Sequence, residues 1–208
     1  MRIDSAGLPF IGGALALALV AGTAVAWVLA LPFLVLGAFF LFFFRDPPRQ
    51  TTASGDEVVS PADGRVLVAG DAESAAKPEG AWQQISIFLS PMDVHVNRVP
   101  VSGRITRVTY QPGTFLPAYH RGAAATNERS EIWIDHGGQT VVARQIVGVL
   151  ARRVVCRAVS GMEVRAGDRY GIMKFGSRMD IFLPPSATIR VNVGDTVRGG
   201  ETVIAVLH

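Results

Sequence analysis

The sequence predicts a mainly β protein: a compact β-sandwich or barrel-like domain that follows an N-terminal membrane anchor. Residues 5–44 contain no charged residue and no histidine, whereas the rest of the chain consists of short apolar segments separated by glycine and proline. Outside the anchor, apolar and polar residues alternate, as in 104–110, which is typical of half-buried antiparallel strands. The roughly 150 residues after the anchor suffice for one domain with its own core.

Residues 1–45 are the predicted anchor. The 40 uncharged residues from Ser5 to Phe44 are mostly Leu, Ala, Val and Phe, and they are long enough for two membrane spans because one span needs about 20. We expect the spans at 10–30 and 33–44, with a turn at Pro32. A single tilted helix with an interfacial tail is the alternative. The run is too long for a signal peptide, whose apolar core has roughly 7–15 residues.

Positive residues flank the anchor on both sides, at Arg2, Arg45 and Arg49. This pattern favours a hairpin with both ends in the cytoplasm, so we expect the β domain on the cytoplasmic side of the cell (inner) membrane. Residues 46–56 contain two prolines and are predicted to be a stiff linker. The β domain then covers residues 57–208.

Composition excludes several classes of partner and chemistry. The net charge is only +3, and no Lys/Arg run with interleaved aromatic residues is present, so we expect no nucleic-acid partner. The single cysteine, Cys156, excludes an internal disulfide and suits a reducing compartment. The four histidines are scattered without ligand spacing, so we expect no metal site.

The predicted strands of the β domain are β-rich segments between turn residues, whereas residues 113–127 could hold a short helix or an ordered loop. A weak internal repeat links 164–168 to 191–195, each with a Gly-Asp turn, as in the hairpins of lipoyl- and biotinyl-type carrier domains. The strands are expected at 66–69, 84–89, 104–110, 132–134, 140–143, 154–156, 180–183, 188–191 and 202–206.

Two clusters precede the middle of the domain. Asp63 lies in Ser-Pro-Ala-Asp-Gly (60–64), where it could simply cap its own turn or serve a reaction. His95 lies between Asp93 and Asn97, and the three side chains would share one face of an extended chain. A structural histidine is the alternative interpretation.

Two further clusters follow. Asn127 and Arg129, with His120 nearby, form either a solvated face or an ion-pair network. The Gly176-Ser177 step lies in Lys-Phe-Gly-Ser-Arg (174–178), between two strand-like segments. Such a step is commonly an ordinary turn, but it could instead be a bond that the protein cuts in itself.

In this order, the motifs Ser-Pro-Ala-Asp-Gly, Leu-Ser-Pro-Met-Asp-Val-His (89–95), Asn-Glu-Arg (127–129) and Lys-Phe-Gly-Ser-Arg resemble phosphatidylserine decarboxylase in its short prokaryotic form. The resemblance covers about residues 57–183. Each motif alone is weak, whereas four in order behind a membrane anchor are specific.

The resemblance implies a proenzyme that cleaves itself between Gly176 and Ser177 by serinolysis. The Ser177 hydroxyl would attack the Gly176 carbonyl, and the amide would shift to an ester. Elimination and hydrolysis would then convert Ser177 into a pyruvoyl cofactor, with no metal. The products would be a large chain ending at Gly176 and a small chain, forming a heterodimer or a higher oligomer.

The resemblance also implies the reaction. The pyruvoyl carbonyl would form a Schiff base with the amine of phosphatidylserine in the membrane, and loss of CO2 would give phosphatidylethanolamine. Asp63, His95 and Ser177 are the implied catalytic residues. The substrate-binding candidates are Arg178, Arg98, Asn127 and Arg129.

The chain departs from the family pattern at two positions. Better-known members carry a second histidine three residues after the first, where this chain has Arg98. Because arginine is effectively always protonated, Arg98 cannot be a base. Either His95 takes the roles of both family histidines, or His120 substitutes for the second one. Arg178 stands where familiar members have Thr or Ser, and it is either a group for a substrate carboxylate or phosphate, or a charged turn residue.

Two other functions remain open from the sequence. The substrate could be another serine phospholipid, such as archaetidylserine. Alternatively, the chain could be a non-catalytic, membrane-tethered β-domain adaptor. A lipoyl or biotinyl carrier is disfavoured, because Lys77 and Lys174 are not in a carrier sequence context.

Overall fold

We describe the protein from a computed structural model that covers residues 2–73, 77–120, 122–149, 153–174 and 176–208. The chain divides into two compact units, Met1–Pro48 and Arg49–His208. Phe175, which belongs to the predicted cleavage motif, lies outside the described residues.

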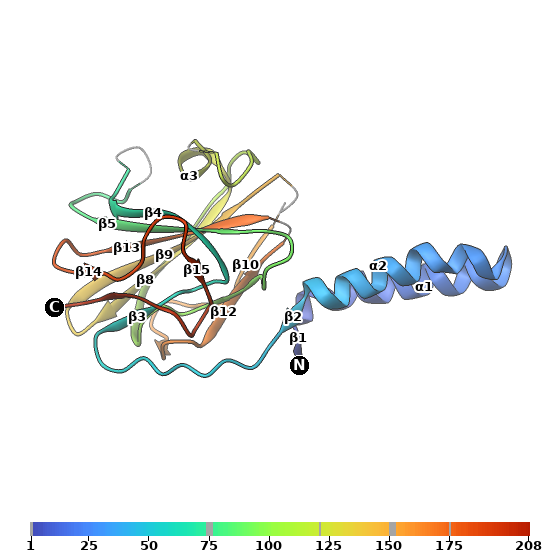
Figure 1. Ribbon diagram of the computed structural model, residues 1–208, viewed down its shortest axis with the longest axis horizontal. Helices are drawn as coiled ribbons and strands as arrows, with labels where there is room; N and C mark the ends of the chain where they lie inside the picture. The colour runs from blue at the N-terminus through green and yellow to red at the C-terminus, as the bar shows by residue number, and fades with distance from the viewer. Residues whose placement is uncertain (1, 74–76, 121, 150–152, 175) are drawn as a thin grey trace. The chain divides into compact units, whose positions relative to one another are not determined.

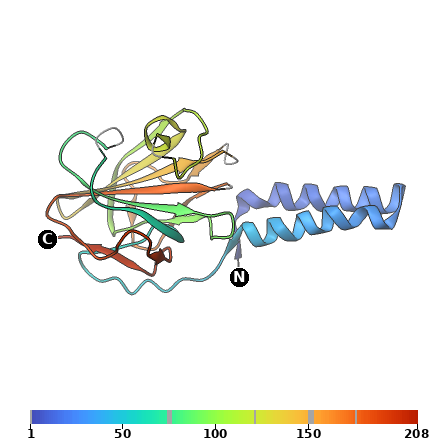
Figure 2. The same cartoon turned by 45° about the horizontal axis from the view of Figure 1, so that its top comes forward.

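The first unit is a pair of antiparallel apolar helices, drawn in blue in Figure 2. Phe10 near the start of α1 lies 5.5 Å, between ring centroids, from Phe40 near the end of α2. Gly37 of α2 packs against Ala14 of α1, and small residues of this kind allow two helices to approach closely. The elements are β1 (Arg2–Ile3), η1 (Ser5–Gly7), α1 (Leu8–Ala24), η2 (Trp27–Leu29), α2 (Ala30–Phe43) and β2 (Arg45–Asp46).

The chain reverses direction between α1 and α2 at residues 25–29, earlier than the predicted turn at Pro32. Pro32 instead lies in the first turn of α2, where the missing N–H of proline costs no helical hydrogen bond. By length and composition, Ser5–Ala24 could cross a membrane, and Trp27–Phe43 is a shorter apolar helix. β1 pairs with β2, so the two ends of the hairpin meet.

The second unit is the β domain, and the predicted mainly β fold is confirmed. Within the described residues it contains an eight-stranded curled sheet with the order β11-β7-β8-β9-β13-β5-β4-β15 (Figure 1). Two three-stranded sheets, β10-β12-β6 and β14-β16-β3, accompany it. The bounds are β3 (Glu57–Val59), β4 (Gly64–Asp71), β5 (Gln83–Leu89), β6 (Val96–Arg98), β7 (Gly103–Gln111), α3 (Ala123–Thr126), β8 (Arg129–His136), β9 (Gln139–Val147), β10 (Val154–Cys156), β11 (Glu163–Val164), β12 (Arg169–Met173), β13 (Ser177–Leu183), β14 (Thr188–Ile189), β15 (Thr196–Val197) and β16 (Val203–Val206).

The hydrophobic core lies between the large sheet and the two small ones. Successive side chains of a strand point to opposite faces, and the inner face of the large sheet carries Ile87, Met179 and Ile181. Val58 of β3 and Met173 of β12 join the same core cluster from the small sheets. β13, with β5 on one side and β9 on the other, is therefore a central strand with a buried inner face.

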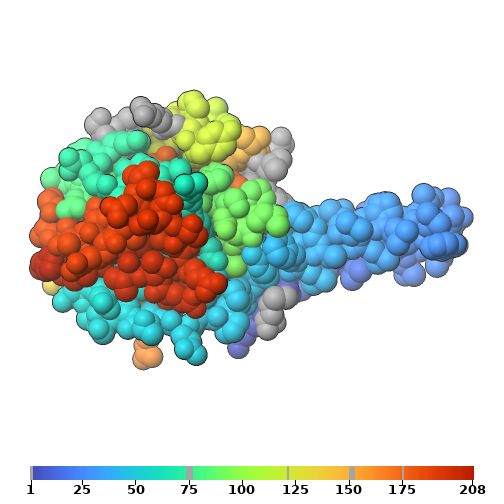
Figure 3. All heavy atoms as spheres, in the orientation of Figure 1, coloured from blue at the N-terminus to red at the C-terminus, as the bar shows by residue number. Residues whose placement is uncertain are grey.

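The C-terminal segment closes the domain against its beginning. β15 pairs with β4, and β16 pairs with β3. In the space-filling view of Figure 3, this red segment lies against the teal segment that contains β4. The weak internal repeat corresponds to two similar turns: the carboxylates of Asp168 and Asp195 each accept the backbone N–H three residues earlier, at 2.8 Å.

Candidate active site

Ser177 begins the central strand β13 and is completely buried. It pairs with Leu89 of β5 and Val147 of β9. Its side chain lies on the inner face of the sheet, because Met179, two residues later, belongs to the core. The Oγ atom has no hydrogen-bond partner among the residues that the structure describes. Since a buried hydroxyl normally has a partner, this atom is a candidate reactive group.

Gly176 precedes it in a left-handed backbone conformation, with φ of +72°, which favours glycine because other residues are strained there. The carbonyl oxygen of Gly176 lies against the backbone of Gly148, the residue after β9. A Cβ atom on Gly148 would overlap this oxygen and would lie 3.4 Å from the Cβ of Ala118. The Gly176 carbonyl therefore fits under the end of β9 only because residue 148 has no side chain.

His95 lies directly before β6 and is fully buried. The backbone N–H of Gly176 donates to Nε2 of His95 at 3.4 Å, so Nε2 carries a lone pair. Nδ1 lies 3.0 Å from the carbonyl oxygen of Asp93, and the hydrogen is therefore assigned to Nδ1. This neutral tautomer places a basic nitrogen at the backbone beside Ser177. The structure thus brings His95 into contact with Gly176, the residue before Ser177.

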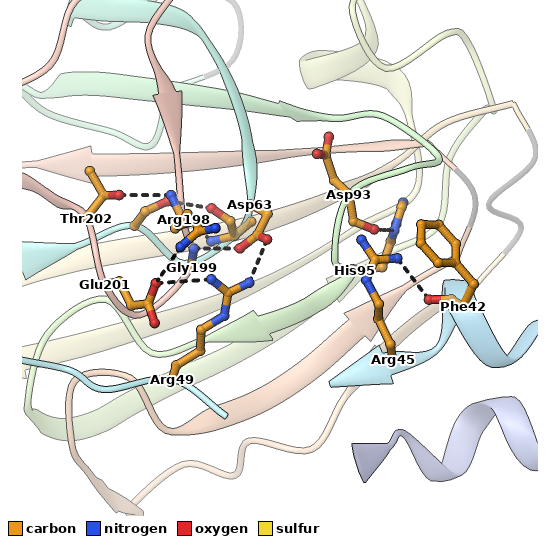
Figure 4. Close-up of polar contacts among 12 residues, drawn as sticks. Phe42, Arg45, Arg49, Asp63, Asp93, His95, Arg198, Gly199, Glu201 and Thr202 are labelled. Carbon is orange, nitrogen blue, oxygen red and sulfur yellow. Dashed lines mark hydrogen bonds and ion pairs between the residues drawn. The ribbon is translucent and has the colours of Figure 1, made fainter. Parts of the chain in front are cut away.

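Asp63 lies in another group of contacts (Figure 4). Its carboxylate accepts a hydrogen bond from Arg49 at 2.7 Å and one from the backbone N–H of Gly199 at 2.8 Å. Among the described residues, no contact joins Asp63 to His95 or Ser177. Arg49 also pairs with Glu201 at 3.2 Å, so the Asp63 carboxylate lies between Arg49 of the predicted linker and the turn that contains Gly199 and Glu201.

An indirect path connects Asp63 to His95. The Asp63 carboxylate fixes the turn that follows Pro61, and the carbonyl oxygen of Pro61 accepts the backbone N–H of Arg98 at 2.8 Å. Arg98 is the last residue of β6, which begins immediately after His95. Asp63 is therefore placed to position β6, and with it His95, which directly precedes that strand.

Asn127 is buried, and its amide group binds backbone groups as well as the Thr114 hydroxyl, which donates to Oδ1 at 3.1 Å. Its Oδ1 accepts the N–H of Leu116 at 2.9 Å, and its Nδ2 donates at 2.8 Å to the carbonyl oxygens of Leu116 and Val147. Val147 is the register partner of Ser177. Asn127 therefore fastens the loop around Leu116 to the end of β9, next to the candidate site.

Arg98 and Arg129 also bind protein groups. The guanidinium of Arg98 donates to the carbonyl oxygen of Gly167 at 3.0 Å. That of Arg129 donates to the carbonyl oxygen of Ala125 at 2.7 Å. Burial lowers the pKa of Arg129, the nearby charge of Arg144 lowers it further, and Glu131 opposes both effects. Arg129 pairs with Ile146, whose side chain is on the outer face of the sheet, opposite Ser177.

Arg178 forms a buried ion pair on the outer face. Its Nε donates to the carboxylate of Asp180 at 2.6 Å, and its Nη2 donates to Oγ of Ser86 at 2.9 Å. The side chains of Arg178 and Asp180 are 3% and 0% exposed. The guanidinium of Arg178 therefore binds groups of the sheet itself. Arg178 lies in a strand, so its interpretation as a turn residue was wrong.

A buried amide pair also lies near the inner face. Nε2 of Gln145 donates to Oδ1 of Asn97 at 2.8 Å, and both residues are completely buried. Asn97 was recognisable from its two-residue spacing after His95. Gln145 and Gly148 had no signal in the sequence, because their positions depend on the pairing of β9 with β13.

An apolar cavity of about 250 Å³ adjoins Gly176. Its lining includes Phe88, Pro117, Tyr119 and Val149. The candidate site is therefore bordered by an apolar cavity at the backbone of Gly176. Among the described residues, no group of three or more His, Cys, Asp and Glu side chains is placed to hold a metal ion.

Comparison with known proteins identifies the family. The family model described as phosphatidylserine decarboxylase matches residues 36–205. A phosphatidylserine decarboxylase proenzyme of Nitrosomonas europaea is 41% identical over 203 residues, which are 97% of this chain and 94% of that protein. The corresponding proenzyme of Salinibacter ruber is 45% identical over 186 residues, covering 86% and 82%. That of Prosthecochloris aestuarii is 42% identical over 172 residues, covering 83% and 79%. The chain therefore belongs to the phosphatidylserine decarboxylase family and is an enzyme of that class.

Proposed function

We propose that the chain is a proenzyme that cuts itself between Gly176 and Ser177 and then decarboxylates phosphatidylserine to phosphatidylethanolamine. One observation carries the proposal: a buried Ser177 hydroxyl, which has no hydrogen-bond partner in the described part of the chain, follows a left-handed Gly176 whose N–H donates to the His95 imidazole. A serine hydroxyl is a poor nucleophile until a base takes its proton. His95 Nε2 is the basic nitrogen that the fold holds beside this bond.

Self-cleavage uses only groups of the chain. His95 takes the proton of Ser177 Oγ, which attacks the Gly176 carbonyl carbon, and the bond from that carbon to the Ser177 nitrogen breaks to give an ester. Removal of the Ser177 α-proton then expels the Gly176 carboxylate. Addition of water and loss of ammonia leave a pyruvoyl group at the start of the small chain.

The residues around Ser177 fit a pyruvoyl group. A ketone at the former Cα of Ser177 would begin a central strand, away from bulk water, with the His95 imidazole close to the preceding residue. When formed, this group supplies a carbonyl that condenses with an amine and withdraws electrons as CO2 leaves. His95 is the residue placed to move a proton at the reacting carbon, and the buried sheet excludes water from it.

Asp63 acts in this proposal as a positioning residue. Its carboxylate holds Arg49 and the turn after Pro61, which is hydrogen-bonded to β6. This arrangement keeps His95, which precedes β6, at the Gly176 backbone. Arg98 donates to Gly167 and takes no proton in this scheme.

The N-terminal helix pair supports a membrane location. Ser5–Ala24 is long and apolar enough to cross a bilayer, and the paired ends of the hairpin carry Arg2 and Arg45. We therefore place the β domain on the cytoplasmic side, by the positive charge at both ends. A phospholipid substrate is held in the same membrane, and the apolar cavity beside Gly176 suits its apolar part.

The test is to measure the release of CO2 from phosphatidylserine by the purified protein in detergent micelles, with archaetidylserine as the competing substrate. The wild-type protein is expected to prefer phosphatidylserine, and Ser177→Ala to be neither cleaved nor active. His95→Ala should block both steps, and Asp63→Asn should slow cleavage without moving the cut. A Ser177→Ala protein that still decarboxylates would refute the proposal, and preference for archaetidylserine would change the substrate only.

A further inference from the structure

The Asn97–Gln145 amide pair joins two sheets beside the candidate active site. Asn97 belongs to β6 of the small sheet and Gln145 to β9 of the large sheet. Their amides meet at 2.8 Å, and neither residue is exposed. Side-chain amides buried between sheets cost stability unless all their groups find partners.

The pair lies next to Ser177 on the same face of the sheet. Gln145 is the register partner of Met179, and Val147 is that of Ser177. Gln145 and Ser177 are therefore diagonal neighbours, a relation that brings side chains within about 7–8 Å. The other member of the pair, Asn97, lies in β6 two residues after His95.

Both amides retain an unused group. Nδ2 of Asn97 and Oε1 of Gln145 are buried and have no hydrogen-bond partner among the described residues, and Oγ of Ser177 is a third such atom. A buried group without a partner requires an explanation, and one explanation is a ligand that the free protein lacks. Here the unused groups are one donor and one acceptor.

The fold leaves space for this pair. A Cβ on Gly171 of β12 would lie 2.7 Å from Nε2 of Gln145, which is closer than such atoms approach. Gly171 is also the register partner of Asn97. The glycine therefore allows the Gln145 amide to reach across the core to Asn97.

We propose that the Asn97–Gln145 pair is the subsite for the amino-acid headgroup of the substrate, with the Asn97 amide N–H donating to the headgroup carboxylate. Gln145 orients the Asn97 amide through the hydrogen bond from its Nε2 to Asn97 Oδ1. This inference rests on the proposed function and deepens it by assigning headgroup recognition to two residues.

A neutral amide suits a carboxylate that must leave as CO2. An arginine would bind the carboxylate strongly before the reaction, and interactions that are stronger in the ground state than in the transition state slow catalysis. The guanidinium nearest in sequence, that of Arg178, is on the opposite face and is bound to Asp180 and Ser86. An amide donor orients the carboxylate without adding a charge.

The experiment compares Asn97→Leu and Gln145→Met, which remove the amides at similar volume, with the matched control Gln84→Met. Gln84 is equally buried, but it lies on the outer face and donates to Ser86 at 2.9 Å. The measurements are the extent of self-cleavage by mass, the melting temperature, KM and kcat for phosphatidylserine, and the inhibition constant of phosphatidylethanolamine, which lacks the carboxylate.

For Asn97→Leu and Gln145→Met we expect normal cleavage and a KM raised about tenfold or more, since a site built to hydrogen-bond a group loses binding when its partner is removed. The inhibition constant of phosphatidylethanolamine should change less than about twofold, because this lipid has no carboxylate to bind the amide. Gln84→Met should lower the melting temperature and leave KM unchanged.

Three results would overturn the inference: an unchanged KM in both variants, an inhibition constant that rises by the same factor as KM, or loss of cleavage in both variants. The last would assign the pair to folding or to cleavage. If only Asn97→Leu fails to fold, Gln145→Met decides by the same criteria. Failure of the proposed function itself would appear in the wild-type protein, as absence of cleavage and of turnover.

Discussion

In the proposed cleavage, each of Ser177, Gly176 and His95 meets a local requirement of the reaction. Ser177 Oγ is buried without a described partner, Gly176 adopts φ of +72°, and Nε2 of His95 accepts a backbone N–H. In the proposed mechanism the neutral imidazole of His95 is the base, so protonation of His95 is expected to stop the first step. The Asp93 carbonyl oxygen, which accepts the hydrogen of Nδ1, fixes the required tautomer.

Gly148 leaves space for the carbonyl group of Gly176 because it has no side chain. A methyl group there would overlap the carbonyl oxygen of Gly176. We expect Gly148→Ala to slow self-cleavage by about 100-fold, because a displacement of about 1 Å at reacting atoms has an effect of this size. The measurement is the decay of the full-length chain after a pulse of cell-free synthesis.

The control for this prediction is Gly13→Ala, whose added methyl group meets nothing within 4 Å. This variant should be cleaved at the wild-type rate. Cleavage of Gly148→Ala at the same rate as Gly13→Ala would show that the close approach to Gly176 is irrelevant to the reaction.

At the residue scale, the sequence predicts those candidate site residues that lie in short local motifs. The Gly176-Ser177 step, His95 and Asp63 are candidates from the sequence because each lies in a local motif. Gly148 and Gln145 could not be found, because their importance depends on the register of β9 against β13. Arg178 was interpreted as a turn residue or substrate ligand, whereas its partner Asp180 is on the same face of a central strand.

At the scale of the element, cleavage would turn a central strand into a chain terminus. Ser177, the first residue of β13, would become the first residue of the small chain, and chain ends fray unless they are held. Arg178 pairs with Asp180 along this strand and with Ser86 of β5. We infer that this network keeps the start of the small chain in place after the bond is cut.

Arg178→Met is expected to be cleaved normally but to lose its small chain in mild urea. Removing one member of a buried ion pair costs about 3–5 kcal/mol, because the remaining charge is left uncompensated. The measurement is native mass spectrometry of the two chains across a urea series, together with KM for phosphatidylserine. An unchanged KM is expected, whereas a substrate-binding role for Arg178 would raise it.

The double variant Arg178→Met, Asp180→Leu is the matched control. Replacing both members of a buried pair with apolar residues is often neutral, so this variant should retain its small chain better than Arg178→Met does. Equal losses in the two variants would contradict the ion-pair explanation.

The strands themselves divide into predictable and unpredictable ones. The long alternating strand β7 is evident from the sequence, because side-chain periodicity is local, whereas only residues 132–134 of β8 were predicted. β6 and β12 were not predicted, since β6 has three residues and β12 contains Gly171. These two short strands pair with each other, and the pairing places Gly171 of β12 opposite Asn97 of β6.

At the scale of the whole molecule, the chain combines an apolar helix pair with one β domain, and both suit work on a lipid. The family match begins at residue 36, within α2, and reaches residue 205, within β16. The mainly β class and the apolar helices followed from composition and periodicity. The position of the helix turn did not, because proline is tolerated in the first turn of α2.

The central claim is that one chain becomes two at Gly176-Ser177, and the mass of the purified wild-type protein under denaturing conditions tests it most directly. The account predicts a large chain ending at Gly176 and a small chain of residues 177–208. The small chain should be lighter than its serine form by the mass of one ammonia molecule and should resist Edman degradation. A single intact chain of 208 residues that persists on long incubation would contradict the account.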